Sequence, residues 1–155
     1  MDLKSLNNIS PKECDIKTVL EEGVKLSTVY IHDKDIKIYS NIKKSARVYI
    51  DENKFLACVV NIIKNAIEAI DKKGEIKVSL EIHNKEVHIK ISNNGEAISK
   101  EKQAEIFEEG FTTKPTGSGL GLHICANNLK AQNGILKLNM STAEKTEFEI
   151  ILPVV

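Results

Sequence analysis

The stretch Phe111-Thr-Thr-Lys-Pro-Thr-Gly-Ser-Gly-Leu-Gly-Leu122 has glycine at every second position, directly before an apolar run, residues 122–131, that can form a helix. Glycine lets backbone amides approach a ligand that a Cβ would block. A helix beginning there presents unpaired N–H groups and the positive end of its dipole, which favour phosphate. The stretch indicates a phosphate site, but taken alone it also fits a flexible turn before a helix. It matches neither the P-loop spacing nor the dinucleotide fingerprint.

A long amphipathic helix is predicted upstream of this stretch. Asp51 is a good N-cap, and the helix is expected to run to about Lys72 and to end at Gly74. At about 100° per residue, its apolar residues fall on one arc, and these are Phe55, Val59, Ile62, Ile63, Ala66, Ile67 and Ile70. The opposite arc carries Asn61, Asn65, Glu68 and Lys72. One face therefore packs on a core while the other presents amides and a carboxylate.

Alternating apolar residues predict strands on both sides of a tight connection at His83–Lys85. Glu75–Ile82 and Glu86–Ile91 form an antiparallel hairpin with one buried face, which ends in the turn composition Ser92-Asn-Asn-Gly95. The remaining predicted elements are a helix over Asp15–Tyr30 that Gly23 weakens, strands at Asp35–Tyr39 and Ala46–Ile50 with a turn around Asn41–Ser45, a short helix at Ser99–Glu109, a helix from Leu122 that stops at Asn133-Gly134, and strands at Leu136–Met140 and Phe148–Leu152. This order predicts an α/β sandwich, with helices on one face of a mixed, mainly antiparallel sheet.

Composition limits the function classes. The chain has 155 residues, enough for one domain with a sizeable core, and 22 basic residues balance 22 acidic ones. A net charge of zero does not favour nucleic acid as a partner. Three widely spaced cysteines suit a reducing cytoplasm, and no apolar run is long enough to span a membrane. We expect a cytoplasmic domain without membrane contact of its own, although a longer parent protein could be membrane-bound.

Three stretches in order, residues 61–69, residues 93–98 and residues 111–122, resemble the N box, the G1 box, and the F and G2 boxes of sensor histidine kinases. In that family they belong to the ATP-binding catalytic domain, whose Bergerat fold is shared with gyrase, mismatch-repair and heat-shock chaperone ATPases. The resemblance covers roughly Asp35–Pro153. It implies an ATP-binding catalytic domain at residues 35–155, with residues 1–34 as a linker or helix connecting to a missing dimerisation domain.

The resemblance implies ATP and Mg²⁺ as cofactors. Asn65 matches the asparagine that ligates Mg²⁺, and its amide oxygen suits a hard cation that keeps most of its waters. Asn93 stands where the family usually has the aspartate that accepts a hydrogen bond from the adenine amino group. The full set of implied nucleotide contacts is Asn61, Asn65, Asn93, Gly95, Ala97, Ile98, Phe111, Thr112, Thr113, Lys114, Gly117, Ser118, Gly119, Leu120, Gly121, Leu122 and Thr146.

Three positions, Asn93, Ala97 and Lys145, depart from the family pattern. The oxygen of Asn93 can still accept a bond from adenine, but its nitrogen is a donor that could meet a guanine carbonyl instead. Ala97 and Lys145 each stand where the family has glycine. Asn61 occupies the position at which hydrolysing relatives carry a glutamate that activates water, and an amide cannot take that proton. The residues therefore favour phosphoryl transfer over ATP hydrolysis; the role of Glu68, one turn beyond Asn65, stays open.

A histidine kinase of this type phosphorylates a histidine on a separate dimerisation domain and passes the phosphoryl group to a response regulator. We expect His83 and His88 to be solvated on the hairpin, and His123 to be structural or near the pocket rim. His32-Asp33 lacks the residues that follow the family's phosphoacceptor histidine. The chain is therefore expected to lack the phosphoacceptor and to be monomeric as an isolated domain. The alternatives are a stand-alone anti-sigma-type serine kinase of the same fold and a non-catalytic nucleotide-binding interaction module.

Overall fold

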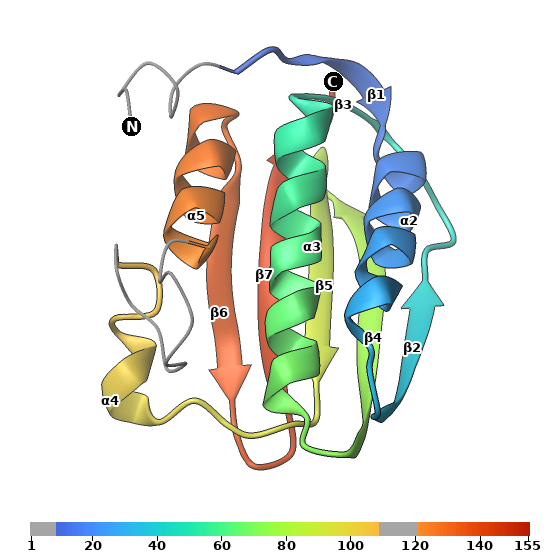
Figure 1. The fold of residues 1–155 in the computed structure, drawn as a ribbon. Helices are drawn as coiled ribbons and strands as arrows, with labels where there is room; N and C mark the ends of the chain where they lie inside the picture. Colours follow the sequence, from blue (N-terminus) through green and yellow to red (C-terminus); the bar gives the residue numbers. More distant parts are fainter. Residues whose placement is uncertain (1–8, 109–120) are drawn as a thin grey trace.

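A computed structural model describes residues 9–108 and 121–155, which form two layers. The elements are β1 (Lys12–Asp15), α2 (Ile16–Ser27), the 3-10 helix η1 (Thr28–Tyr30), β2 (Asp35–Asn41), β3 (Arg47–Ile50), α3 (Glu52–Ala69), β4 (Lys73–His83), β5 (Glu86–Asn93), α4 (Lys100–Gln103), α5 (Gly121–Ala131), β6 (Ile135–Ser141) and β7 (Thr146–Pro153). One layer is a sheet in the order β2-β4-β5-β7-β6, in which the β2–β4 pair is parallel and the other pairs are antiparallel. Helices α2, α3 and α5 lie on one face of it (Figure 1). This arrangement confirms the predicted α/β sandwich.

Helix α3 lies at the centre of the helical layer. Asp51 caps it as predicted, in an extended conformation, and accepts a hydrogen bond from the backbone N–H of Lys54 at 3.1 Å. The buried side chains recur three or four positions apart, and they are Phe55, Cys58, Val59, Ile62, Ile63, Ala66 and Ile67. They share one core with fully buried residues of the sheet, among them Ile76, Ile89 and Ile150. The opposite arc keeps Asn61 and Asn65 half-buried.

The end of α3 differs from the prediction. The helix ends at Ala69 rather than near Lys72, and Gly74 lies inside β4 instead of terminating the helix. The reason is tertiary: the side chain of Ile70 is 1 % exposed and its backbone is extended, so the chain turns away to bury it. In a longer helix the carbonyl of Ala69 would accept a hydrogen bond within the helix. Here it accepts the N–H of Glu96 at 2.8 Å.

The predicted hairpin is confirmed. Strands β4 and β5 pair antiparallel, with His83 opposite Glu86, and Asn84 and Lys85 form the two-residue connection. Both connecting residues have positive φ, 50° and 63°, which is the conformation of a type I′ turn. The hairpin thereby delivers Asn93 to the end of a central strand.

The predicted strands Asp35–Tyr39 and Ala46–Ile50 exist, as β2 and β3, but they belong to different sheets. Strand β2 pairs in parallel with β4, whereas β3 pairs antiparallel with β1, for which the sequence predicted no strand. Pairing of strands is decided by contacts between distant segments, which local alternation does not reveal.

Helix α2 and η1 together cover the predicted helix Asp15–Tyr30. Gly23 fits there because a Cβ would lie 2.7 Å from Cγ1 of Val59, so the glycine lets α2 approach α3 closely. Ile16 and Leu20 are fully buried in the common core. The division of the chain into a linker at residues 1–34 and a catalytic domain at residues 35–155 stays a prediction. Within the described residues, none of the helices has the length and apolar character needed to cross a membrane.

The C-terminal half follows the predicted order. Helix α4 is shorter than the predicted Ser99–Glu109, with turns following Gln103. Helix α5 stops where predicted: Asn133 has φ of 64°, and the N–H of Gly134 donates to the carbonyl of Leu129 at 2.6 Å.

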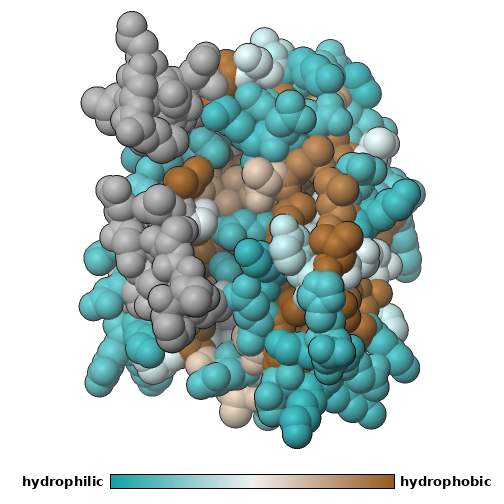
Figure 2. All heavy atoms as spheres, viewed as in Figure 1, coloured by the Kyte–Doolittle hydropathy of each residue, from teal (hydrophilic) through white to brown (hydrophobic). Residues whose placement is uncertain are grey.

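Figure 2 shows the helix-bearing face as a mixture of polar and apolar surface. Val29, near the end of α2, is 63 % exposed.

Candidate functional site

Two of the predicted site residues meet at one end of the sheet. Asn93 is the last residue of β5 and Thr146 is the first of β7, and the register of these strands places them opposite each other. Both side chains are polar yet buried, at 6 % and 3 % exposure. Buried polar side chains need partners, so this pair marks a place where hydrogen bonds decide the local structure.

Asn93 shapes the turn that follows it. Its Oδ1 accepts the backbone N–H of Gly95 at 2.9 Å, which identifies this atom as the oxygen of the amide. A carbonyl oxygen has a second lone pair, so Oδ1 can still accept from a ligand. A Cβ on Gly95 would lie 2.5 Å from the carbonyl oxygen of Ala69, so only glycine lets this turn seat on the end of α3.

The hydroxyl of Thr146 is part of a short chain of hydrogen bonds. Its Oγ1 lies 2.7 Å from Oγ of Ser141, and that Oγ accepts the backbone N–H of Ile98 at 2.8 Å. Ile98 is half-buried, while Ala97, the other predicted contact in this segment, is exposed. Ser141 was not predicted, because it ends an ordinary amphipathic strand; a serine opposite the predicted Thr146 would have been the signal, had the strand pairing been known.

Asn61 and Gly121 form a second group, between α3 and α5. Gly121 begins α5, and a Cβ there would lie 2.6 Å from Oδ1 of Asn61. The Nδ2 atom of Asn61 is fully buried and has no hydrogen-bond partner among the residues that the structure describes. A buried amide N–H without an acceptor costs stability, and a ligand that accepts its hydrogen bond would remove that cost. Phosphate oxygens are such acceptors, so these two residues fit a phosphate-bearing ligand.

Helix α3 connects the two groups. Asn65 follows Asn61 by one turn on the same arc and is half-buried, and Ala69, one turn further, contacts Gly95. Leu122, in the first turn of α5, is half-buried, and Glu68 is exposed. The remaining predicted contacts lie outside the described residues and stay predictions: Phe111, Thr112, Thr113, Lys114, Gly117, Ser118, Gly119 and Leu120.

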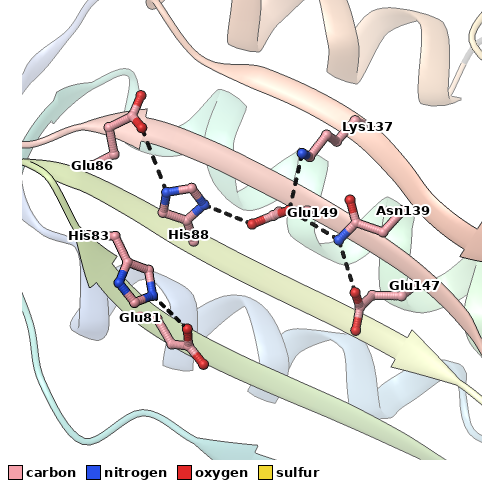
Figure 3. A network of polar contacts seen from close by, with 8 residues as sticks. All are labelled: Glu81, His83, Glu86, His88, Lys137, Asn139, Glu147 and Glu149. Carbon is pink, nitrogen blue, oxygen red and sulfur yellow. Dashed lines mark hydrogen bonds and ion pairs between the residues drawn. The ribbon is translucent and has the colours of Figure 1, made fainter.

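Three of the four histidines are held by neighbouring groups. His83 Nε2 lies 2.7 Å from Oε2 of Glu81, and His88 Nδ1 lies 2.8 Å from Oε2 of Glu149 (Figure 3). His123 Nδ1 lies 3.2 Å from the carbonyl oxygen of Phe107. The expectation that His88 is simply solvated is therefore wrong, because its side chain is 20 % exposed and its ring is hydrogen-bonded to Glu149.

The face of the sheet away from the helices, here called the open face, carries a polar network that includes His88, Lys137, Asn139, Glu147 and Glu149 (Figure 3). Burial alone would raise the pKa of Glu149, but hydrogen bonds from His88 and Asn139 hold its pKa below the ordinary value. A carboxyl with a lowered folded-state pKa contributes stability above the unfolded-state pKa and loses it as the pH falls through the folded-state value.

Glu149→Gln is therefore expected to reduce the unfolding free energy at pH 7 by on the order of 1 kcal/mol. The difference from wild type should shrink as the pH falls below the ordinary glutamate pKa. Urea unfolding at a series of pH values from neutral to acidic measures this difference, with Glu144→Gln, at an exposed position, as the control. A difference that is constant with pH would contradict the role given to ionised Glu149.

Comparisons with known proteins point to one family. A family model described as histidine kinase-, DNA gyrase B- and HSP90-like ATPase matches residues 50–155. Sporulation kinase C of Bacillus subtilis is 31% identical over 140 residues, which is 89% of this chain and 31% of that protein. Sensor histidine kinase ZraS of Salmonella typhimurium is 32% identical over 157 residues, which is 100% of this chain and 34% of that protein. The chain thus spans about a third of the length of these relatives.

Solved structures show the same fold. The catalytic domain of histidine kinase ThkA superimposes with a TM-score of 0.83 at 26% identity, over 94% of this chain and 97% of that one. Full-length ShkA, solved in complex with AMPPNP, has a TM-score of 0.83 at 22% identity, over 95% of this chain and 32% of that one.

Proposed function

We propose, because this chain belongs to the family of histidine kinase-, DNA gyrase B- and HSP90-like ATPases, that it is the ATP-binding catalytic domain of a two-component sensor histidine kinase. It binds ATP with Mg²⁺ and transfers the γ-phosphoryl group to a histidine on a separate dimerisation domain. The observation that most supports a phosphate ligand is the buried amide nitrogen of Asn61 beside Gly121, which has no partner within residues 9–108 and 121–155. In this proposal the α- to γ-phosphates lie between α3 and α5.

The adenine ring is proposed to lie at the end of β5 and β7. Asn93 Oδ1 keeps one lone pair for the adenine amino group after accepting from Gly95, and the Thr146 hydroxyl lies beside it. Gly95 lets the turn after Asn93 seat against Ala69 at the end of α3, which fixes the turn beside the proposed base position. A neutral amide replaces the carboxylate usual in the family, so we expect ATP binding with reduced affinity rather than a loss of the site.

Magnesium is proposed to bind at Asn65. The cation would neutralise phosphate charge as the γ-phosphoryl group leaves. Asn65 would offer its amide oxygen from the half-buried arc of α3, one turn after Asn61. The polar arc of α3 thus serves both the phosphates and the cation.

Asn61 directs the chemistry toward transfer rather than hydrolysis. A water molecule attacking ATP needs a base nearby, and an amide at this position cannot accept the proton. Glu68 lies two turns onward from Asn61 and is exposed. The contribution of this domain is therefore to position the γ-phosphoryl group, while the partner domain supplies the attacking histidine.

The partners follow from this role. We propose a histidine-bearing dimerisation domain as the direct partner, a response regulator downstream, a cytoplasmic location, and no contact with nucleic acid or membrane by this segment. His83, His88 and His123 are engaged in the contacts described above, and His32 lacks the residues that follow the family's phosphoacceptor, which supports a phosphoacceptor on that separate domain. The isolated domain is expected to sediment as a monomer.

Asn65→Ala is expected to weaken binding of ATP in the presence of Mg²⁺ about tenfold, equivalent to ~1.4 kcal/mol, and to leave metal-free binding unchanged. The reason is that only the metal-bound form uses the amide oxygen. Calorimetric titration with ATP, with Mg²⁺ and with EDTA, measures both affinities. Asn53→Ala, an exposed position in the first turn of the same helix, is the matched control. An equal loss in both titrations would remove Asn65 from the metal site.

A second experiment tests the reaction. The chain is incubated with γ-labelled ATP, Mg²⁺ and a histidine-bearing dimerisation domain supplied as a second polypeptide. Label on the second polypeptide that is lost in acid and kept in base indicates phosphohistidine and supports the proposal. Acid-stable label on a serine would favour the serine kinase alternative. ATP binding without any transfer would favour a nucleotide-binding interaction module.

A further inference from the structure

Ser141 joins three segments of the candidate site that are far apart in the sequence. It ends β6, its Oγ accepts the backbone N–H of Ile98 at 2.8 Å, and the same Oγ lies 2.7 Å from Oγ1 of Thr146. Ile98 lies in the segment between β5 and α4, and Thr146 begins β7. The half-buried hydroxyl of Ser141 thus connects Ile98, in the segment after the Asn93–Gly95 turn, to Thr146, the residue opposite Asn93.

A β-bulge in β6 places Ser141 on the same face of the sheet as Thr146. Leu138 pairs with Phe148, but Met140 pairs with Glu147, so Asn139 is an extra residue in β6. Side chains alternate between the two faces, so one extra residue moves every following side chain to the other face. Ser141 therefore lies opposite Thr146; without the bulge Met140 would occupy that place.

Contacts on the open face hold the bulge. The Nδ2 atom of Asn139 donates to Oε2 of Glu147 at 2.9 Å and to Oε1 of Glu149 at 3.0 Å. Both carboxylates are buried, Glu147 at 9 % exposure and Glu149 at 5 %. The extra residue is thus fastened by two charge-assisted hydrogen bonds, which indicates that the position of Ser141 is built into the strand.

The hydrogen bond between Ser141 and Thr146 uses only one of their two hydroxyl protons. Ser141 and Thr146 carry two hydroxyl protons, and their mutual contact uses one of them whichever residue donates. Within residues 9–108 and 121–155, no acceptor for the second proton is found. Thr146 lies opposite Asn93, with Ser141 on its far side, so a base or a water bound at Asn93 would be the natural acceptor.

We propose that Ser141 is a positioning residue of the nucleotide site. It orients the hydroxyl of Thr146 toward the bound base and fixes the backbone of Ile98. The role deepens the proposed function and rests on it, because Ser141 acts through Thr146 and Ile98 rather than on the phosphates.

The test is calorimetric ATP affinity, with Mg²⁺, of a small set of variants. Ser141→Ala is expected to raise the Kd three- to tenfold, and Ser141→Thr, which keeps the hydroxyl, is expected to stay within twofold of wild type. Ser79→Ala, a half-buried serine of β4 near the open face, is the matched control and should not change the Kd. Urea unfolding of each variant reports the fraction folded, and only folded samples are titrated.

A double variant separates positioning from a general structural effect. In the Thr146→Val background, Ser141→Ala is expected to cost less affinity than it does alone, because the hydroxyl that it orients is already absent and only the bond to Ile98 is left to lose. Losses that multiply in the double variant, or a Ser141→Ala protein that binds like wild type, would overturn the positioning role alone. A wild-type protein that binds no ATP would overturn the proposed function, and this inference with it.

Discussion

Gly121→Ala is expected to lower the unfolding free energy by about 2 kcal/mol and to weaken ATP binding more than tenfold. The added Cβ would lie 2.6 Å from Oδ1 and 2.8 Å from Cγ of Asn61. The clash is with the buried amide of Asn61, so either that amide or the first turn of α5 must move. In the proposed site both of them face the phosphates, so either movement weakens binding.

The Asn61→Ala background tests this cause directly. Removing the amide makes room for the Cβ and also removes an unsatisfied buried donor, so Asn61→Ala alone is expected to cost little stability. Gly121→Ala in this background should then unfold at nearly the same urea concentration as Asn61→Ala, while ATP affinity stays low in both. Lys130→Ala, an exposed position on α5, is the control for helix substitutions. A Gly121→Ala protein as stable in the wild-type background as wild type would show that the close approach is unimportant.

Gly95→Ala is expected to have the largest effect on stability, a loss of about 3 kcal/mol. A Cβ on Gly95 would lie 2.5 Å from the oxygen and 2.6 Å from the carbon of the Ala69 carbonyl, and 2.8 Å from the nitrogen of Ile70. These are backbone atoms at the end of α3, so they cannot rotate away as a side chain would. The turn itself must move, which breaks the bond from the Gly95 N–H to Asn93.

Urea unfolding and ATP titration together measure the consequences of Gly95→Ala. The base contact of Asn93 depends on the same turn, so the remaining folded protein is expected to bind ATP at least tenfold more weakly than wild type. Glu96→Ala is the matched control, because that side chain is exposed and its backbone N–H, which bonds Ala69, is unchanged. Loss of stability in both variants would point to the loop as a whole rather than to the missing Cβ at residue 95.

Most of the elements could be predicted because their signals are local. The buried residues of α3 recur at helical spacing, Asp51 caps the helix through a bond to a residue three positions away, and Asn84-Lys85 forms the hairpin turn within itself. Each of these depends on residues a few positions apart. Propensity and periodicity therefore describe them well.

The candidate site was predicted by residue type and order rather than by geometry. Asn93 and Thr146 are 53 positions apart, and only the β5–β7 register places them opposite each other. Gly121 was predicted as a backbone contact to phosphate, and its close approach to Asn61 adds a second reason why it must be glycine. The role of Ser141 was missed, because it depends on a bulge that alternation along β6 does not reveal.

The amino-acid sequence by itself determined the helices, the hairpin, the fold class and the residues that resemble a family's nucleotide site, because these follow from side chains that are neighbours along the chain. Tertiary structure alone decided that α3 ends at Ala69, that β2 joins β4 while β3 joins β1, and that the bulge at Asn139 brings Ser141 to Thr146. Each of these depends on a contact between distant segments, where burying an apolar side chain or pairing a polar group outweighs local preference.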